Sequence, residues 1–136
     1  MKKISILLFL ILQFSVFFAQ EPVSTTTQQI SLKAGWNIVS FHVFPDSSDV
    51  KAVFQPLIDE SALVKVQDEN GNCVEDLGLF GGWINYIGNL SLSEGYKVKV
   101  SKDCQLGVEG VAAPLPFDIP LRKGWNLIGF PRSSGV

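Results

Sequence analysis

Short runs of alternating apolar and polar residues, separated by glycines or prolines, make up most of the chain. A period of two places the apolar side chains on one face of a β-strand. In the run 96–100, Val98 and Val100 share one face and Lys97 and Lys99 share the other. Strands at this spacing predict a mainly β protein, a small antiparallel β-sandwich or a barrel-like domain. The predicted strands lie in segments 30–33, 36–43, 63–69, 72–76, 83–87, 90–93, 96–100 and 105–108.

One segment has a helical period instead. Five apolar residues between Val50 and Ile58 recur with the spacing i, i+3, i+4, i+7, i+8, which forms one face of a helix. Ser48 and Asp49 precede the segment and suit a helix N-terminus. Pro56 has no N–H and clashes with the preceding turn of a helix. The sequence therefore predicts one short helix that ends or kinks near residue 55.

Asn70-Gly71 separates two alternating runs, 63–69 and 72–76. Asn-Gly favours the positive φ angles of a type I′ turn. These two runs are therefore predicted to form a β-hairpin with such a turn.

The chain contains an internal repeat. Segment 30–41 recurs as segment 119–130, with six identities in twelve positions. We interpret the shared motif as structural, because glycine allows a sharp turn, tryptophan buries a large ring and asparagine pairs with turn backbone groups. We therefore place both tryptophans in the core. The motif consists of Gly35, Trp36 and Asn37 in the first copy and of Gly124, Trp125 and Asn126 in the second.

The repeat suggests how the chain is divided. Residues 30–113 are predicted to form a β-rich repeat unit. Pro114 and Pro116 mark a linker, and residues 114–136 contain this linker and either the start of a second, truncated repeat or strands that close the first unit. The chain is therefore expected to be a stand-alone variant or a fragment of a larger repeat protein.

The N-terminus has the layout of a signal peptide. Lys2 and Lys3 precede an uncharged apolar run of 15 residues, 4–18, which is shorter than the roughly 20 residues that span a bilayer. We predict a signal peptide at 1–19, cleaved after Ala19, and a flexible polar lead at 20–29. The protein is then exported to the periplasm, the cell surface or the medium, with no membrane span after cleavage.

Composition excludes several classes of function. The chain has 136 residues, with 11 Lys and Arg against 13 Asp and Glu, and only one histidine and two cysteines. Without Lys2 and Lys3 the balance is 9 against 13, a charge of −4. Nucleic-acid binding needs a basic surface, and zinc sites need clustered His and Cys. We predict no nucleic-acid partner, no metal, no cofactor and no catalytic residue.

Cys73 and Cys104 are the two cysteines, and in an exported protein a structural disulfide between them would suit the compartment. The alternative is two unpaired thiols on strands that are not adjacent. Without a Cys-x-x-Cys motif, a redox role is not expected.

Two other functions rest on particular side chains. Trp83 and Tyr86 follow a glycine-rich bend and form the candidate platform for a glycan, although both are also suited to the core. A small hydrolase would use paired carboxylates, which occur at 59–60, 68–69 and 75–76, but all three pairs border turns where charges are normally solvated.

Several segments resemble a repeat module of large secreted and cell-surface proteins of Bacteroidetes. That module sits beside adhesin-like or Ig-like domains and a C-terminal type IX secretion sorting domain, and no activity is generally assigned to it. The resemblance implies a non-catalytic structural or adhesive module whose partners are a surface glycan, a protein or neighbouring repeats. It covers roughly residues 30–131, although this chain has no recognisable sorting domain. The segments that carry the resemblance are 35–40, 64–72, 80–88, 94–100 and 119–126.

Overall fold

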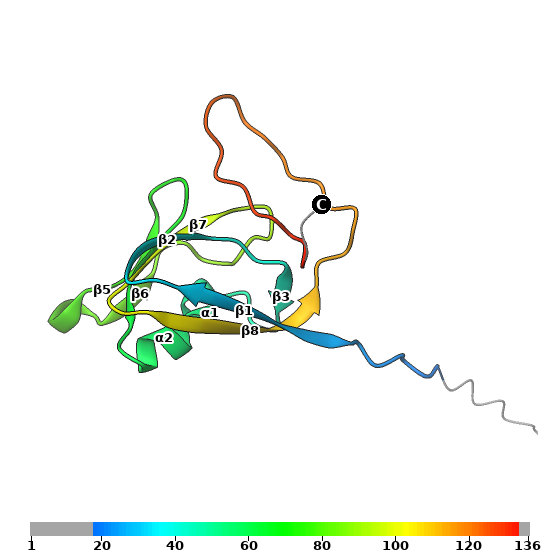
Figure 1. The fold of residues 1–136 in the computed structure, drawn as a ribbon, viewed down its shortest axis with the longest axis horizontal. Helices are drawn as coiled ribbons and strands as arrows, with labels where there is room; N and C mark the ends of the chain where they lie inside the picture. The colour runs from blue at the N-terminus through cyan, green and yellow to red at the C-terminus, as the bar shows by residue number, and fades with distance from the viewer. Residues whose placement is uncertain (1–17, 134–136) are drawn as a thin grey trace, which may run out of the picture.

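The computed structural model describes residues 18–133, and it contains two antiparallel sheets packed as a sandwich (Figure 1). This confirms the mainly β prediction and selects the sandwich over the barrel. The three-stranded sheet has the order β1 (Thr25–Leu32), β8 (Cys104–Ala112) and β3 (Val43–Pro45). The five-stranded sheet has the order β2 (Gly35–Val39), β7 (Tyr96–Val100), β4 (Leu63–Gln67), β5 (Cys73–Asp76) and β6 (Trp83–Asn85).

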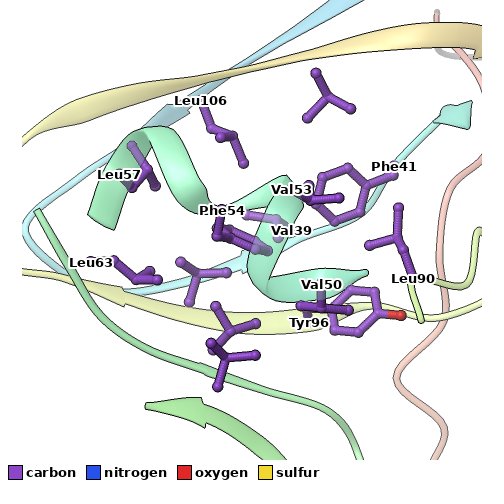
Figure 2. Close-up of a cluster of buried hydrophobic side chains, with 14 of the residues drawn as sticks. Val39, Phe41, Val50, Val53, Phe54, Leu57, Leu63, Leu90, Tyr96 and Leu106 are labelled. Carbon is purple, nitrogen blue, oxygen red and sulfur yellow. The ribbon is translucent and has the colours of Figure 1, made fainter. Parts of the chain in front are cut away.

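Aromatic rings lie at the centre of the core between the sheets. The Phe41 ring meets those of Phe54 and Tyr96 edge-on, with ring centroids 6.1 and 6.0 Å apart. Figure 2 shows these rings beside Leu106 of β8 and Leu57, so that both sheets and the helical segment contribute to one cluster. Burial raises the pKa of the Tyr96 phenol to about 12. The Tyr96 hydroxyl therefore stays protonated at neutral pH.

The helical segment contains two short helices rather than one. α1 (Val50–Val53) begins after Asp49, whose carboxylate accepts a hydrogen bond from the Ala52 N–H at 2.9 Å. α2 (Gln55–Asp59) follows at once and has Pro56 in its first turn. Proline is tolerated there because that N–H has no partner within a helix. The expected break near residue 55 is confirmed, but Pro56 lies in the first turn of a second helix instead of ending the segment.

The polar lead expected at 20–29 is corrected from Thr25 onward. β1 begins at Thr25 and pairs with β8 from Thr25 opposite Val111 to Leu32 opposite Cys104. Its N-terminal half is exposed, so its pairing comes from backbone hydrogen bonds and needs no apolar alternation. An edge strand of this kind gives no hydrophobic signal in the sequence.

The β4–β5 hairpin is confirmed, but its turn differs from the predicted type I′. Within the hairpin loop, residues 68–72, only Gly71 has a positive φ, of 89°, whereas a type I′ turn needs two such residues. The buried Asp68 closes the loop instead, because its carboxylate accepts hydrogen bonds from the Asn70 and Asn72 backbone N–H groups at 2.9 and 2.8 Å. The carboxylate of Asp68 is therefore part of the fold and is not simply solvated.

Residues 114–133, which we call the C-terminal arm, leave β8, project from the sandwich and return to it (orange to red in Figure 1). The arm adds no strand to either sheet. The arm pairs with the sandwich in β fashion at one isolated antiparallel bridge, between Ile128 and Glu94. The predicted strand at 90–93 is also absent, although Leu90 and Leu92 are buried.

Candidate functional site: the Gly-Trp-Asn turns and the groove of the C-terminal arm

The first Gly-Trp-Asn turn connects β1 to β2 and is closed by the Asn37 side chain. Its Oδ1 accepts a hydrogen bond from the Lys33 N–H at 3.0 Å, and its Nδ2 donates to the Lys33 and Gly35 carbonyls at 2.8 and 3.2 Å. Gly35 has a φ of 100°, a conformation that side chains disfavour. Asparagine fits because its amide donates and accepts at once.

The second turn, in the arm, has the same geometry. Asn126 Oδ1 accepts from the Arg122 N–H at 2.9 Å, and its Nδ2 donates to the Arg122 and Gly124 carbonyls at 2.9 and 3.0 Å. Gly124 has a φ of 99°. The motif therefore specifies one local turn, with or without a sheet around it.

Replacing Asn37 by alanine is expected to lower the free energy of unfolding by about 1–2 kcal/mol, because the Lys33 N–H and carbonyl lose their partner. Chemical denaturation monitored by circular dichroism measures this change. The matched control is Asn126→Ala, which alters the same turn outside the sandwich and should leave global unfolding within about 0.5 kcal/mol. Equal losses in both variants would contradict the prediction.

The two tryptophans are not in the core, contrary to expectation. Trp36 is 54% exposed, and Trp125 is fully exposed. Trp36 lies on β2 opposite Lys99, whose Nζ stands 5.7 Å from the ring centroid. The buried residue of this strand is Val39, on the other face. Trp125 has no sheet beneath it. The motif therefore presents its ring outward in both copies.

Asp103, which follows β7, binds the first turn. Its carboxylate accepts a hydrogen bond from the Ala34 N–H at 2.9 Å and pairs with Lys33 Nζ at 3.2 Å. The Ala34 N–H, and then Lys33, hold the pKa of this carboxyl below its usual value. The turn thus forms a small binding site for a carboxylate, and in this protein that carboxylate comes from Asp103 of the same chain.

A groove of about 400 Å³ lies beside the second turn. The β4–β5 hairpin loop forms one wall, and the arm forms the other. Glu69 Oε2 joins the walls by accepting a hydrogen bond from the Leu127 N–H at 3.0 Å. The lining residues are Glu69, Asn70, Lys97, Arg122, Lys123, Trp125, Asn126 and Leu127.

Close backbone contact fixes the arm to the sandwich. The Gly95 N–H donates to the Leu127 carbonyl at 3.0 Å, and the Gly129 N–H donates to the Ser93 carbonyl at 2.9 Å. A Cβ on Gly129 would collide with the Leu92 carbonyl oxygen. In the first copy of the repeat, Ser40 stands at the position of Gly129 and makes no such close contact. The close approach of the arm to the sandwich therefore explains the glycine at 129.

Of the two alternatives for the cysteines, the structure has the unpaired thiols rather than the disulfide. Cys73 lies beside Glu75 on β5, and its Sγ donates to Glu75 Oε1 at 3.2 Å. Cys104 begins β8 in the other sheet and packs against the core. The two side chains thus belong to different sheets and different environments. Burial raises the pKa of both thiols, which keeps them protonated at neutral pH.

The two aromatic residues proposed as a glycan platform, Trp83 and Tyr86, differ in how far they are exposed. Trp83 is half-buried and packs against the core, whereas Tyr86 is mostly exposed. Tyr86 is therefore the more accessible of the two rings.

Each of the three acidic pairs contains a carboxylate with a partner in the fold. Asp59 accepts a hydrogen bond from the Gln55 side chain at 2.8 Å, Asp68 closes its loop, and Glu75 pairs with Lys65 Nζ at 3.1 Å.

Sequence reasoning missed the groove. Its basic residues Arg122 and Lys123 lie directly before the second Gly-Trp, which is the signal that was available. Lys97 and Glu69 come from distant segments and reach the groove only through the fold. Within residues 18–133 there is no cluster of three or more His, Cys, Asp or Glu side chains that could bind a metal.

No family model matches the chain, and comparisons with curated proteins and with solved structures found no match either. In the part of the chain that the structure describes, no helix is long and apolar enough to cross a membrane.

Proposed function

We propose that the protein is a non-catalytic structural or adhesive β module of an exported or cell-surface protein, related to the Bacteroidetes repeat module that its motifs resemble. The observation that carries this proposal is the Gly-Trp-Asn turn, which recurs 89 positions apart (Trp36 and Trp125) with the same hydrogen bonds. One copy is built into a sandwich and the other is docked onto it. Such repetition favours a modular role.

The alternatives have weaker support. A glycan platform of Trp83 and Tyr86 would use one ring that already packs against the core. A hydrolase with paired carboxylates would depend on Asp59, Asp68 or Glu75, each of which already accepts a hydrogen bond within the fold. Adhesion needs only exposed side chains, and the arm supplies several of them. They are Leu115, Leu121, Trp125, Ile128 and Phe130.

Display on cells tests the adhesive role. A non-adherent bacterial host would carry the chain on an outer-membrane anchor, and attachment to films of protein and of polysaccharide would be counted against cells with the anchor alone. We expect increased attachment, unchanged by Glu75→Gln. Attachment no greater than that of the anchor alone on every film would overturn the adhesive role, and cleavage of a film polysaccharide that Glu75→Gln abolishes would favour carboxylate chemistry.

Export is tested at the N-terminus. Expression with the leader intact in a Gram-negative host is expected to give a secreted or periplasmic protein that begins at Gln20, because Ala19 ends the apolar run. Residues 1–17 lie outside the described residues. N-terminal sequencing and intact mass identify the cleavage point. A Lys2→Glu, Lys3→Glu variant serves as control and should accumulate uncleaved, whereas a cell-associated wild-type chain that keeps Met1 would contradict the prediction.

A further inference from the structure

The first Gly-Trp-Asn turn shows what this turn can bind. Asp103 places its carboxylate on the Ala34 backbone N–H and on the Lys33 ammonium group. By the repeat alignment, Lys33 corresponds to Arg122 and Ala34 to Lys123. The second turn therefore presents the same backbone N–H position together with a guanidinium group, which suits a carboxylate well.

Within residues 18–133 the second turn has no carboxylate of this kind. The ion pairs there join Lys33 to Asp103 and Lys65 to Glu75, so neither Arg122 nor Lys123 is paired. Lys97 adds a third cation to the groove, against the carboxylate of Glu69 in its lining and that of Glu94 in the adjoining pocket, which Arg122 also lines. In a protein whose predicted mature charge is −4, this groove is locally positive, and it attracts anions.

The remaining groups of the groove suit a sugar ring. Trp125 is fully exposed, so its indole face is free to stack on the apolar face of a pyranose. The Asn70 amide and Glu69 supply donors and acceptors for hydroxyl groups at the opposite wall. The groove thus combines a carboxylate receptor, a flat ring and polar side chains.

We propose that this groove binds an acidic polysaccharide, with a uronate carboxylate at Arg122 and the Lys123 N–H and its pyranose ring against Trp125. The proposal rests on the adhesive function proposed above and names its ligand.

An acidic protein segment is the other source of a carboxylate, and the charges disfavour one built like the segment that fills the first turn. The segment that fills the first turn brings Lys99 to the Trp36 ring together with Asp103. At the second turn, Lys123 stands where the first turn has Ala34, and Lys97 lines the same groove. A further lysine beside Trp125 would meet like charges. An acidic peptide without lysine would satisfy the charges equally well, so the exposed Trp125 ring, which suits the apolar face of a pyranose, is what favours the polysaccharide.

Binding of the purified protein to polygalacturonate tests the proposal, with dextran as the neutral polysaccharide, dextran sulfate as the sulfated one and polyglutamate as the acidic peptide. We expect binding to polygalacturonate and not to dextran. Trp125→Ala should weaken it by about tenfold or more, which corresponds to the loss of one well-packed contact. Trp36→Ala is the matched control, because it changes the same motif outside the groove.

Charge variants complete the test. Arg122→Gln with Lys123→Gln should abolish binding, and Lys51→Gln, on α1, should leave it unchanged. Equal binding to polyglutamate, or equal loss in Trp36→Ala and Trp125→Ala, would overturn the proposal, as would binding to dextran as strong as that to polygalacturonate. Tighter binding to dextran sulfate that still requires Trp125 would identify a sulfated sugar as the source of the anion and would refute the uronate. If displayed cells still attach to protein films when polygalacturonate is not bound, the ligand is refuted and the adhesive function stands.

Discussion

Phe41→Ala is expected to lower the free energy of unfolding by about 3–5 kcal/mol, the cost typical of removing a buried phenylalanine ring. Phe41 has no solvent exposure, and its ring packs edge-on against Phe54 and Tyr96. Small domains have only about 5–15 kcal/mol of stability in total. Urea titration, followed by tryptophan fluorescence and circular dichroism, measures the change.

The repeat offers a matched control for this variant. Phe130 occupies the position of Phe41 in the second copy, yet it is 47% exposed and lies in the C-terminal arm. Phe130→Ala should therefore cost less than about 1 kcal/mol. Phe80→Ala, in an exposed 3-10 turn (Gly78–Phe80), should cost even less. Similar losses in all three variants would mean that Phe41 is not at the centre of the core.

The strands could be predicted wherever one face is buried. Lys97 and Lys99 alternate with Val98 and Val100, and the structure places the valines in the core. Thr25–Gln29 gave no such signal because their side chains lie at an edge, where backbone pairing alone forms the strand. The hairpin was found from Asn70-Gly71, but its turn type depended on the Asp68 carboxylate, whose burial is a property of the folded loop.

The repeat was visible in the sequence, whereas the side on which each ring lies was not. Periodicity does not distinguish the two faces of β2, and Trp36 and Ile38 occupy the outer one. The carboxylate of Asp103 reaches the first turn across 69 positions from Ala34, a tertiary contact that local patterns do not encode. The groove depends on such contacts throughout. The positive charge of the groove therefore could not be predicted from the mildly acidic composition of the chain.

Docking of the arm requires a glycine at 129, so Gly129→Ala is expected to release it. The added Cβ would meet the Leu92 carbonyl oxygen, which belongs to the backbone and has little room to move. Overpacking of this kind costs about 1–3 kcal/mol. The Gly95 N–H, which donates to Leu127, should then exchange with solvent roughly ten to a hundred times faster.

Hydrogen exchange measured by NMR tests this release, and Gly107→Ala is the control. A Cβ on Gly107 meets only the flexible Gln29 side chain, at 3.2 Å, and Gly107 lies on β8 away from the arm. Its substitution should leave exchange at Gly95 unchanged. Unchanged exchange in Gly129→Ala as well would show that docking tolerates a side chain there. Release of the arm should also separate Leu127 from Glu69 and weaken polygalacturonate binding, because the groove exists only while both walls are in contact.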